Sequence, residues 1–534
     1  MCGIFAYIVQ GNIDKPTNIY NEKFIMRQFD KGKSRGPESS NTFITQYHES
    51  YIFMGFHRLA INGLEPETKI MCVDGIYLIC NGEIYNYRSF KFKMNSKSDC
   101  EVIIHLYKLY GIKYLFELLD GVFAFVLYDT NIQRMFVARD PYGVRPLFIH
   151  NNSTFASELK QIIKIGINVK QFEPGTFMEL EIEKNSQPTV IRQERYTTFG
   201  FSKMIFNNLY DIYGILYQSL YAAVKKRVTT TERPIACLLS GGLDSSTITA
   251  LVNMLMPKGQ KLETYSIGME GSTDLVYAQI VADYLGTKHT SIILTEDQFF
   301  DAIPEVIKAI ECYDTTTVRA SVGNYLVGKY ISEHSDAKVI FNGDGADELM
   351  GGYKYFSSTP NEIEFDRECK RLLSNIHFFD VLRSDRCIST HGLEPRTPFL
   401  DRSFVQTYLS LPPGLRNHSY NDQPEKFLLR GCIGFMNPSL LPEGILLRTK
   451  EAFSDGVSSM DRSWYTIIGE KVKNLCADNS NYIHNPPQTD EQRYYRELFE
   501  KDYTYCGDIV PYFWMPKWVK TTDPSARTIT NEDI

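Results

Sequence analysis

Cys2 stands at a position where a chain can acquire a reactive thiol. It follows the first methionine, which is normally removed when a small residue comes next. Removal would leave a free α-amine beside the thiol, and this amine could act as the base that generates a thiolate. A thiolate attacks amide carbonyls, so Cys2 is a candidate nucleophile for amide hydrolysis. Taken alone, Cys2 fits a buried structural cysteine near the start of a strand better.

The run SGGLDSS, residues 240–246, has the composition of a phosphate-binding loop. It follows the apolar stretch IACLL and opens a predicted helix. Glycine amides and the positive end of a helix would then face an anion. The chain has no GxxxxGK[ST] motif, so a phosphate-reaching lysine of the Walker type is not predicted. The alternative is an ordinary helix cap.

Acidic and glycine residues follow another apolar stretch, in NGDGADE at 342–348. If this stretch is a strand parallel to IACLL, both loops lie at the carboxyl edge of one sheet, where ligands bind in open α/β folds. Asp344 and Asp347 could bind Mg²⁺ or handle a proton there, and Asp244 could join the ion from the first loop. The alternatives are an acidic surface turn or a calcium loop, although the spacing does not fit the EF-hand.

The composition limits the class of protein. The chain has 534 residues with 43% hydrophobic and 23% charged side chains, which is typical of a globular protein of two or three domains. A net charge of -7 without basic runs argues against nucleic acid as a partner. No stretch approaches the roughly 20 apolar residues of a membrane span, and the start resembles no signal peptide. We therefore expect a cytoplasmic protein without a membrane partner.

The cysteines favour neither a disulfide framework nor a zinc site. There are 11 of them, which is an odd number, and none form a CxxC pair. Most are expected to be reduced residues of the core.

The elements that would position these residues change type along the chain. Up to about residue 195 the sequence predicts short strands with one helix near 99–110, and their continuous apolar character predicts a sandwich covered on both sides. From about residue 205 strands alternate with helices, which predicts a parallel sheet. We expect domains at 1–195 and 205–534, with the polar stretch 187–202 as the linker.

Five segments of the first domain, which follow one another along the sequence, resemble those of a known family and change the interpretation of Cys2. They are SRGPES (34–39), FHRLAING (56–63), CNGEIYNY (80–87), KSDCEVI (97–103) and DPYGVRPLF (140–148). With Cys2 they resemble a class II glutamine amidotransferase, whose fold is the α+β N-terminal nucleophile sandwich (αββα). One departure is Glu38, where the family commonly has Asp.

The resemblance implies a role for each matching residue of the glutamine pocket. Asn81 and Gly82 would form the oxyanion hole, and Arg58 and Asp99 would hold the carboxylate and the ammonium of glutamine, with Glu83 also in the pocket. The residue types suit these roles, because an arginine fork matches a carboxylate and an anion matches an ammonium. Gly82 allows close approach of the backbone to the oxyanion.

The second domain also resembles a known family. SGGLDSS resembles the PP-loop of ATP pyrophosphatases, an α/β fold with a parallel sheet. Further segments resemble the synthetase domain of asparagine synthetases: ECYDTTTVRAS (311–321), FNGDGADELMGGYKYF (341–356), GLEPRTPFLD (392–401), EKFLLR (425–430), RTKEAFSDGV (448–457), WMPKW (514–518) and DPSART (523–528). The match extends over nearly the whole chain.

This second resemblance implies sites for ATP and for aspartate. The residues implied for ATP are Leu239, Ser240, Gly241, Gly242, Asp244, Ser245, Ser266, Ile267, Gly268, Asn342 and Gly343. Those implied for aspartate are Thr316, Arg319 and Asp347, with Asp244 and Asp347 also on Mg²⁺. Lys450 would neutralise phosphate charge, and Asp344 would be the acid or base. Asn342 and Asp344 stand where Ser and Glu are frequent, so the shorter carboxylate puts the role of Asp344 in question.

Together the resemblances imply that glutamine supplies ammonia and that ATP activates aspartate as β-aspartyl-AMP. Ammonia would cross between the domains through an apolar tunnel, and the chain could form a homodimer. The rival enzyme is a β-lactam-forming synthetase, which shares the scaffold but has no use for a glutaminase. A different class of rival is a noncatalytic binding or storage protein, which would tolerate decay at Cys2 or SGGLDSS. Neither site shows such decay.

Overall fold

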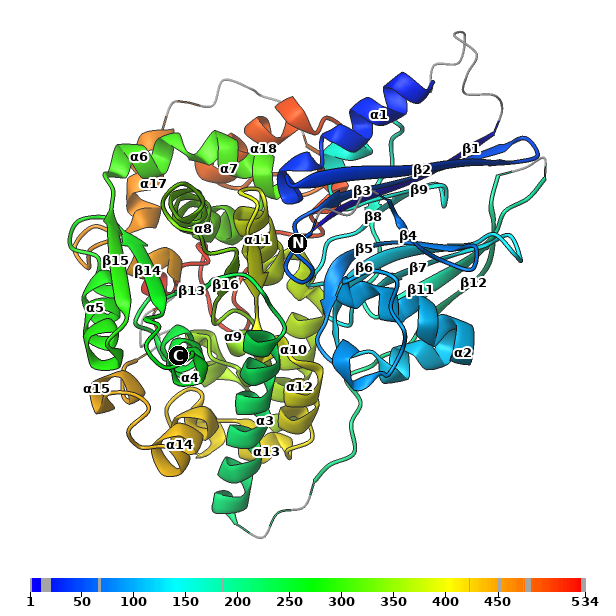
Figure 1. Ribbon diagram of the computed structural model, residues 1–534. Helices are drawn as coiled ribbons and strands as arrows, with labels where there is room; N and C mark the ends of the chain where they lie inside the picture. The colour runs from blue at the N-terminus through cyan, green and yellow to red at the C-terminus, as the bar shows by residue number, and fades with distance from the viewer. Residues whose placement is uncertain are drawn as a thin grey trace.

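The chain folds into two halves that pack side by side, as the computed structural model shows in Figure 1. The structure describes residues 2–10, 21–65, 69–184, 187–204, 206, 208–421, 423–449, 451, 453–473, 475 and 482–529. Within these ranges no helix combines the length and the apolar character that crossing a membrane requires.

The first half is a sandwich of two antiparallel six-stranded sheets. The first sheet has the order β10 (Lys170–Gln171), β8 (Phe148–His150), β9 (Thr154–Ala156), β1 (Gly3–Gln10), β3 (Ser50–Arg58), β2 (Ser39–Tyr47). The second has the order β12 (Thr189–Arg195), β11 (Thr176–Glu181), β7 (Arg134–Arg139), β6 (Gly121–Asp129), β5 (Ile76–Ile84), β4 (Met71–Val73).

Strand β1 shows why the sandwich is covered on both sides. Ile4 and Ile8 belong to the apolar cluster between the two sheets, whereas Phe5 and Tyr7 face the other way. Side chains alternate between the faces of a strand, so a continuously apolar strand must bury both. Helix α1 (Glu22–Asp30) packs outside the first sheet and α2 (Val102–Leu118) outside the second. The predicted αββα sandwich is confirmed.

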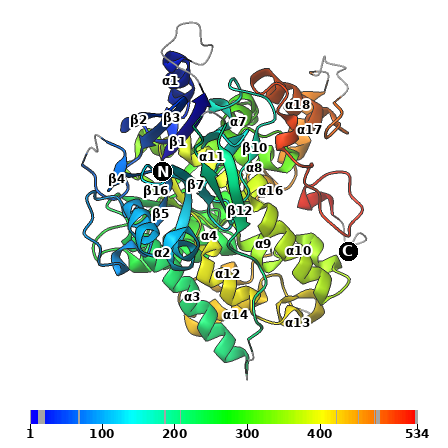
Figure 2. The same ribbon diagram turned by 90° about the vertical axis from the view of Figure 1, so that its right-hand side faces the viewer.

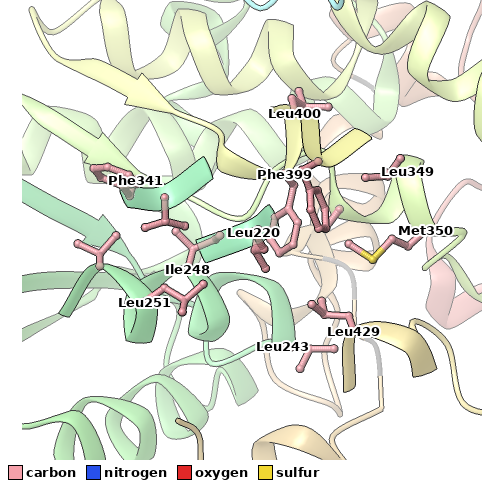
Figure 3. Packing of buried hydrophobic residues seen from close by; sticks show 14 of the residues in the cluster. Leu220, Leu243, Ile248, Leu251, Phe341, Leu349, Met350, Phe399, Leu400 and Leu429 are labelled. Carbon is pink, nitrogen blue, oxygen red and sulfur yellow. The ribbon is translucent and has the colours of Figure 1, made fainter. Parts of the chain in front are cut away.

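The second half is built around a five-stranded parallel sheet. Its order is β15 (Lys288–Ile293), β14 (Glu263–Gly268), β13 (Ile235–Leu238), β16 (Val339–Phe341), β17 (Glu394–Arg396). Cys237 and Phe341 contribute to the apolar cluster on one face, part of which Figure 3 shows. Ala236 and Ile340 contribute to the cluster on the other face. The predicted α/β fold with a parallel sheet is confirmed.

Helices cover both faces of this sheet. The first face carries α3 (Leu209–Thr229), α4 (Leu243–Leu255), α5 (Thr273–Leu285), α9 (Ala346–Met350), α10 (Glu362–Asn375), α12 (Arg402–Leu409), α14 (Phe427–Met436) and α15 (Glu443–Leu446). The second carries α6 (Glu296–Asp301), α7 (Ile303–Ile310), α8 (Thr315–His334), α11 (Asp380–Ser389), α17 (Trp464–Val472) and α18 (Asp490–Asp502). The short helices α13 (Pro413–Arg416) and α16 (Phe453–Gly456) complete the set. Figure 2 shows α17 and α18 at the opposite end of this half from α13 and α14.

The expected linker at 187–202 is partly wrong. Residues 189–195 form strand β12, which pairs with β11 at the edge of the second sheet. Its sequence is polar because most of its side chains are exposed, and Arg192 there pairs with Glu179 of β11 at 2.6 Å. Polarity alone therefore does not separate an exposed edge strand from a linker. Strand β2 and helix α1 were also absent from the sequence prediction.

A buried ion-pair network joins the two halves beside Cys2. Arg35 of the first half donates to the backbone oxygen of Cys2 at 3.1 Å and pairs with Asp385 of α11 at 2.8 Å. Arg145 pairs with the other oxygen of Asp385 at 3.2 Å. The side chains of both arginines are fully buried. The carboxylate of Asp385 therefore pairs with two buried cations from the opposite half, and Arg145 has a second partner in Glu394 at 3.7 Å.

We expect Asp385→Asn to destabilise the protein by about 3–5 kcal/mol, because it leaves Arg35 and Arg145 short of a buried counter-charge. The midpoint of urea unfolding measures this loss. The control is Asp297→Asn, whose carboxylate is 78% exposed where it pairs with Lys471. An exposed pair contributes about 1 kcal/mol or less, so the control should barely move the midpoint. Equal effects in the two variants would contradict the role of Asp385.

Candidate active sites

The thiol of Cys2 is buried at the start of β1. Cys2 is 8% exposed, and its Sγ lies 3.9 Å from the backbone oxygen of Leu59. Burial raises the pKa of the Cys2 thiol to about 11, so the group is a neutral thiol at pH 7. A nucleophile here needs a base within reach. The nitrogen of Cys2, which would be an amine after removal of Met1, is the nearest atom that could serve.

Asn81 of β5 contacts Cys2 directly. Its Oδ1 accepts a hydrogen bond from the nitrogen of Cys2 at 3.1 Å. Its Nδ2 is buried and has no hydrogen-bond partner among the described residues. A buried donor without a partner costs free energy, which an oxyanion arriving at the Cys2 thiol would recover. This geometry suits the predicted oxyanion hole.

Gly82 follows Asn81 where β5 and β6 run very close together. A Cβ added to Gly82 would lie 2.5 Å from the backbone oxygen of Val122. Any larger residue would push the two strands apart and displace Asn81. Only glycine therefore fits beside the predicted oxyanion hole.

The two charges expected to hold glutamine are both near this pocket. The Arg58 guanidinium donates to the backbone oxygens of Asn62, Gly63 and Glu65 at 3.1, 2.6 and 2.8 Å. Asp99 is buried and accepts from the nitrogen of Ile84 at 2.5 Å. Burial raises the pKa of Asp99 to about 6, so its carboxylate is ionised at neutral pH and able to hold an ammonium.

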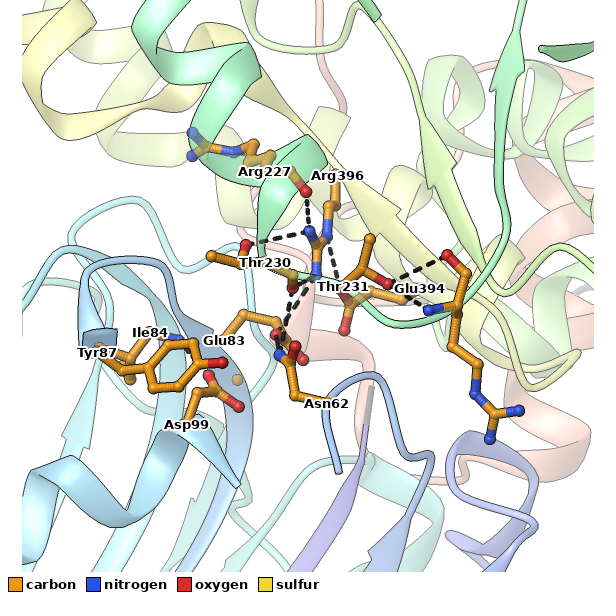
Figure 4. A network of polar contacts seen from close by, with 12 residues as sticks. Asn62, Glu83, Ile84, Tyr87, Asp99, Arg227, Thr230, Thr231, Glu394 and Arg396 are labelled. Carbon is orange, nitrogen blue, oxygen red and sulfur yellow. Dashed lines mark hydrogen bonds and ion pairs between the residues drawn. The ribbon is translucent and has the colours of Figure 1, made fainter. Parts of the chain in front are cut away.

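Glu83 lies between this pocket and the second half, as Figure 4 shows. Its Oε2 accepts from Asn62 at 3.1 Å and pairs with Arg396 of β17 at 3.4 Å. Burial, together with the nearby carboxylates of Asp99 and Glu394, raises the pKa of Glu83 well above its usual range. Glu83 thus connects the glutamine pocket to the second half. Contact between Glu83 and glutamine stays a prediction.

The second site is a cavity of about 220 Å³ at the carboxyl edge of the parallel sheet. Strands β13 and β16 are adjacent, so the loops that follow them meet. A Cβ added to Gly343 would lie 2.7 Å from the nitrogen of Ser245. The structure places these predicted site residues on the wall of the cavity: Leu239, Ser240, Gly242, Asp244, Ser245, Ser266, Ile267, Thr316, Asn342, Gly343, Asp344 and Asp347.

The loop after β13 leads straight into α4. Gly241 has φ +71°, and a Cβ there would lie 2.4 Å from the backbone carbon of Tyr277. Gly242 is the N-cap of α4 and makes no side-chain capping bond. The first amides of this helix are therefore without a side-chain cap, as an anion site requires.

Asp244 and Asp347 converge on one ammonium. Lys426 pairs with Asp347 at 2.5 Å and also with Asp244, and its own side chain is 2% exposed. Oδ1 of Asp244 is buried and has no hydrogen-bond partner among the described residues. Two neighbouring carboxylates suit a magnesium ion that takes its other ligands from phosphate and water. No group of three or more acidic, His or Cys side chains in the described ranges could hold a metal without such help.

Asp344 projects into the same cavity with partners of its own. It accepts from Nδ2 of Asn342 at 2.7 Å and pairs with Arg383 at 3.3 Å. Arg383 pairs in addition with Asp380. The position suits a group that handles a proton, and the acid or base role of Asp344 stays a prediction.

Three predicted residues do not line the cavity, and a fourth falls outside the residues that the structure describes. Gly241 and Gly268 are not among the residues that line the cavity: Gly241 has a positive φ in the loop before α4, and Gly268 is the last residue of β14. Arg319 pairs with Glu491 and Asp523 instead of facing the cavity. Lys450 lies outside the described residues.

Other residues of the wall were missed from the sequence. Lys426 belongs to EKFLLR, which carried the resemblance without a role for the lysine, and only the fold brings it to Asp244 and Asp347. Nothing in the sequence indicated that Arg383 would line the cavity, because it lies on α11, which is well separated from the acidic loop along the chain. Trp514 and Ile529 also line the cavity: Trp514 belongs to WMPKW, which was matched to the family without a role, and Ile529 directly follows DPSART.

Comparison with known proteins defines the class. The family model described as a glutamine amidotransferase domain matches residues 1–202, and the model described as asparagine synthase matches residues 216–365 and 357–506. Curated relatives named "Asparagine synthetase [glutamine-hydrolyzing]" are similar throughout. The protein of Cricetulus griseus is 39% identical and that of Homo sapiens 40%, each over 93% of this chain and 94% of the relative. That of Gallus gallus is 41% identical over 89% and 90%.

The matches describe an amidotransferase fused to a synthetase. The chain belongs to the family of glutamine-hydrolysing asparagine synthetases.

We expect Asn81→Ala to slow glutamine hydrolysis by roughly 10² to 10³, because one oxyanion donor is lost. Synthesis from ammonium salts should be unaffected, and assays of glutamate and asparagine measure the two activities. Asn81→Asp is the matched variant, since it keeps the oxygen that accepts from Cys2 but lacks the Nδ2 donor. Full activity in Asn81→Asp would mean that the residue only holds Cys2 in place.

The affinity for glutamine should fall as pH is lowered through about 6. Asp99 is ionised above its raised pKa and neutral below it, and only the anion attracts the ammonium of glutamine. Calorimetric titration of a Cys2→Ala variant, which binds glutamine without consuming it, measures the dissociation constant between pH 5 and pH 8. In a Cys2→Ala, Asp99→Asn double variant this dependence should vanish. The same pH dependence of the dissociation constant in both proteins would exclude Asp99 as the group whose titration causes it.

Proposed function

We propose that this protein makes asparagine from aspartate, with ammonia released from glutamine and with ATP as the energy source. The products are asparagine, glutamate, AMP and pyrophosphate. The observation that carries the proposal is the presence of both sites in one chain. They are the Cys2 pocket, where Asn81 Nδ2 has no hydrogen-bond partner among the described residues, and the cavity between the loops of β13 and β16. A β-lactam-forming synthetase would have no use for the first site.

The first reaction is hydrolysis of the glutamine side chain. Asp99 and Arg58 bind the two ends of the amino acid, and the α-amine of Cys2 accepts the proton of the thiol. The thiolate attacks the amide carbon, and Asn81 Nδ2 with the Gly82 amide stabilises the oxyanion. The α-amine returns the proton to the amide nitrogen, the C–N bond breaks and ammonia leaves, so that a thioester to Cys2 remains. Water then hydrolyses the thioester, which releases glutamate and restores the thiol. The buried pocket keeps the thioester away from bulk solvent until this step.

The second reaction joins aspartate to AMP. The loop amides around Ser240 and Gly242 bind the phosphates of ATP, and the β-carboxylate of aspartate attacks the α-phosphorus. Mg²⁺ bound by Asp244 and Asp347 would neutralise the leaving pyrophosphate. Ammonia then attacks the adenylate carbonyl, and Asp344 takes the proton that ammonia loses. A carboxylate is a poor electrophile, whereas an adenylate carries a good leaving group.

The remaining expectations complete the proposal. The two functional units divide between residues 195 and 205, and ammonia passes between them without entering the solvent. Apolar side chains from both halves, among them Leu59, Val144 and Leu239, belong to one cluster, which provides a suitable environment for a neutral molecule. The reaction takes place in the cytoplasm, where ATP and both amino acids are available. Association into a homodimer is part of the same proposal.

The test of the proposal follows the oxygen atoms. Aspartate labelled with heavy oxygen in its β-carboxylate is turned over with glutamine and Mg-ATP, and mass spectrometry locates the label. Because the carboxylate attacks the α-phosphorus, one labelled oxygen should appear in AMP and none in pyrophosphate. Formation of ADP with labelled inorganic phosphate would mean an acyl-phosphate route and would overturn the proposed mechanism.

A further inference from the structure

The segment Trp514–Ile529 lies over the synthetase cavity and forms part of its wall. We call it the cover segment. Five of its residues line the cavity: Trp514, Pro516, Pro524, Ala526 and Ile529. These five side chains are apolar, whereas the polar side chains of Asp523, Ser525 and Arg527 bond to neighbouring parts of the protein. A wall of this kind excludes water without binding a substrate by charge.

One anchor of the cover segment is an arginine that the sequence had assigned to aspartate. Both oxygens of Asp523 accept from the Arg319 guanidinium, at 2.8 and 2.7 Å. The opposite edge of the same guanidinium pairs with Glu491 of α18 at 2.8 and 2.5 Å. The Arg319 side chain is 4% exposed. Four of its five donor hydrogens are thus engaged by protein carboxylates, and it does not line the cavity.

The second anchor joins the cover segment to the loop that carries RTKEAFSDG. Arg527 donates to Glu451 at 2.6 Å and to the backbone oxygen of Ser459 at 2.7 Å. Ser525 donates to the buried carboxylate of Asp455 at 2.6 Å. Glu451 itself lines the cavity, so this anchor fixes the cover segment against a second part of the wall.

A third contact holds the C-terminal end of the cover segment. Lys354 donates from Nζ to the backbone oxygen of Ile529 at 2.5 Å. Lys354 follows the acidic loop of β16 and also lines the cavity. The cover segment is therefore attached to α8, to the loop after α15 and to the chain beyond α9, which are three separate walls of one cavity.

We propose that the cover segment shields the aspartyl adenylate from water, and that Arg319 is a positioning residue that holds the cover through Asp523. This proposal rests on the synthetase reaction proposed above. It assigns Arg319 a partner inside the protein in place of the carboxylate of the substrate. Bidentate pairs on both edges of a buried guanidinium give a rigid attachment, because each adds directional hydrogen bonds to the charge attraction.

The chemical consequence of a loose cover is a wasted turnover. Water attacks the carbonyl carbon of the adenylate, the bond from that carbon to the phosphate oxygen breaks, and AMP leaves. The products are aspartate, AMP and a proton, and no asparagine forms. Exclusion of water from a reactive intermediate is what a closed wall provides.

The experiment measures the ratio of AMP to asparagine with saturating ammonium chloride, aspartate and Mg-ATP. The intact protein should give a ratio near one, because the synthetase reaction forms one AMP for each asparagine. Asp523→Ala and the more conservative Asp523→Asn should each raise the ratio at least twofold. The matched control is Asp508→Ala, which removes an exposed carboxylate outside the cover segment and should leave the ratio near one.

A second measurement separates positioning from substrate binding. Arg319→Lys combined with Asp523→Ala should raise the ratio no further than Asp523→Ala alone, because both substitutions release the same anchor. Trypsin should cut the Asp523 variants faster at Lys517 and Lys520 than the intact protein. Unchanged resistance at the other lysines and arginines would show that the variants are otherwise folded.

Two outcomes would overturn the proposal. Asp523 variants with a ratio near one would show that the cover does not protect the adenylate. Additive effects, with Arg319→Lys raising the KM for aspartate while Asp523→Ala leaves it unchanged, would return Arg319 to the substrate. Failure of the intact protein to make any asparagine from ammonium would instead contradict the proposed function itself.

Discussion

Charge buried between the two halves has to be neutralised by the protein, and this constraint fixes how the halves meet. Arg35 and Arg145 of the first half and Arg396 of the second are all buried, with Asp385 and Glu394 as their counter-charges. Each ion loses several kcal/mol of hydration, so a shift of one half against the other would leave charges without partners. Arg35 also binds the backbone of Cys2. Cys2, the proposed nucleophile, is thereby held in register with the second half.

The parallel sheet imposes a comparable order on the second site. Because β13 and β16 are neighbours and run in the same direction, the loops SGGLDSS and NGDGADE that follow them must lie at the same edge of the sheet. The contact between Gly343 and Ser245 brings the predicted phosphate loop and the acidic loop into one cavity. A change in the conformation of either loop therefore affects the other, and the sites proposed for the nucleotide and the amino acid share a single wall.

The sequence alone was sufficient to predict the features that depend on residues close together in the chain. The strand before SGGLDSS, the helix after it and the apolar strands of the sandwich all followed from composition and order. Cys2 and Asn81 were predicted through resemblance, and the structure adds that Asn81 bonds the nitrogen of Cys2. Lys426 could not be assigned, since its partners are far away in the chain. Arg319 shows the same limit, because nothing local reveals that Asp523 and Glu491 surround it. Strand β12 was misread because an exposed edge and a linker have the same polarity.

The position of Cys2 has a practical consequence for anyone who produces the protein. Residues left in front of Cys2 keep its nitrogen in an amide, and an amide nitrogen has no lone pair free to take a proton from the thiol. The nitrogen is in addition buried against Asn81, where an extension has little room. A purification tag that remains at this end would yield a folded synthetase that depends on added ammonia. Such a preparation could be mistaken for an enzyme that never used glutamine.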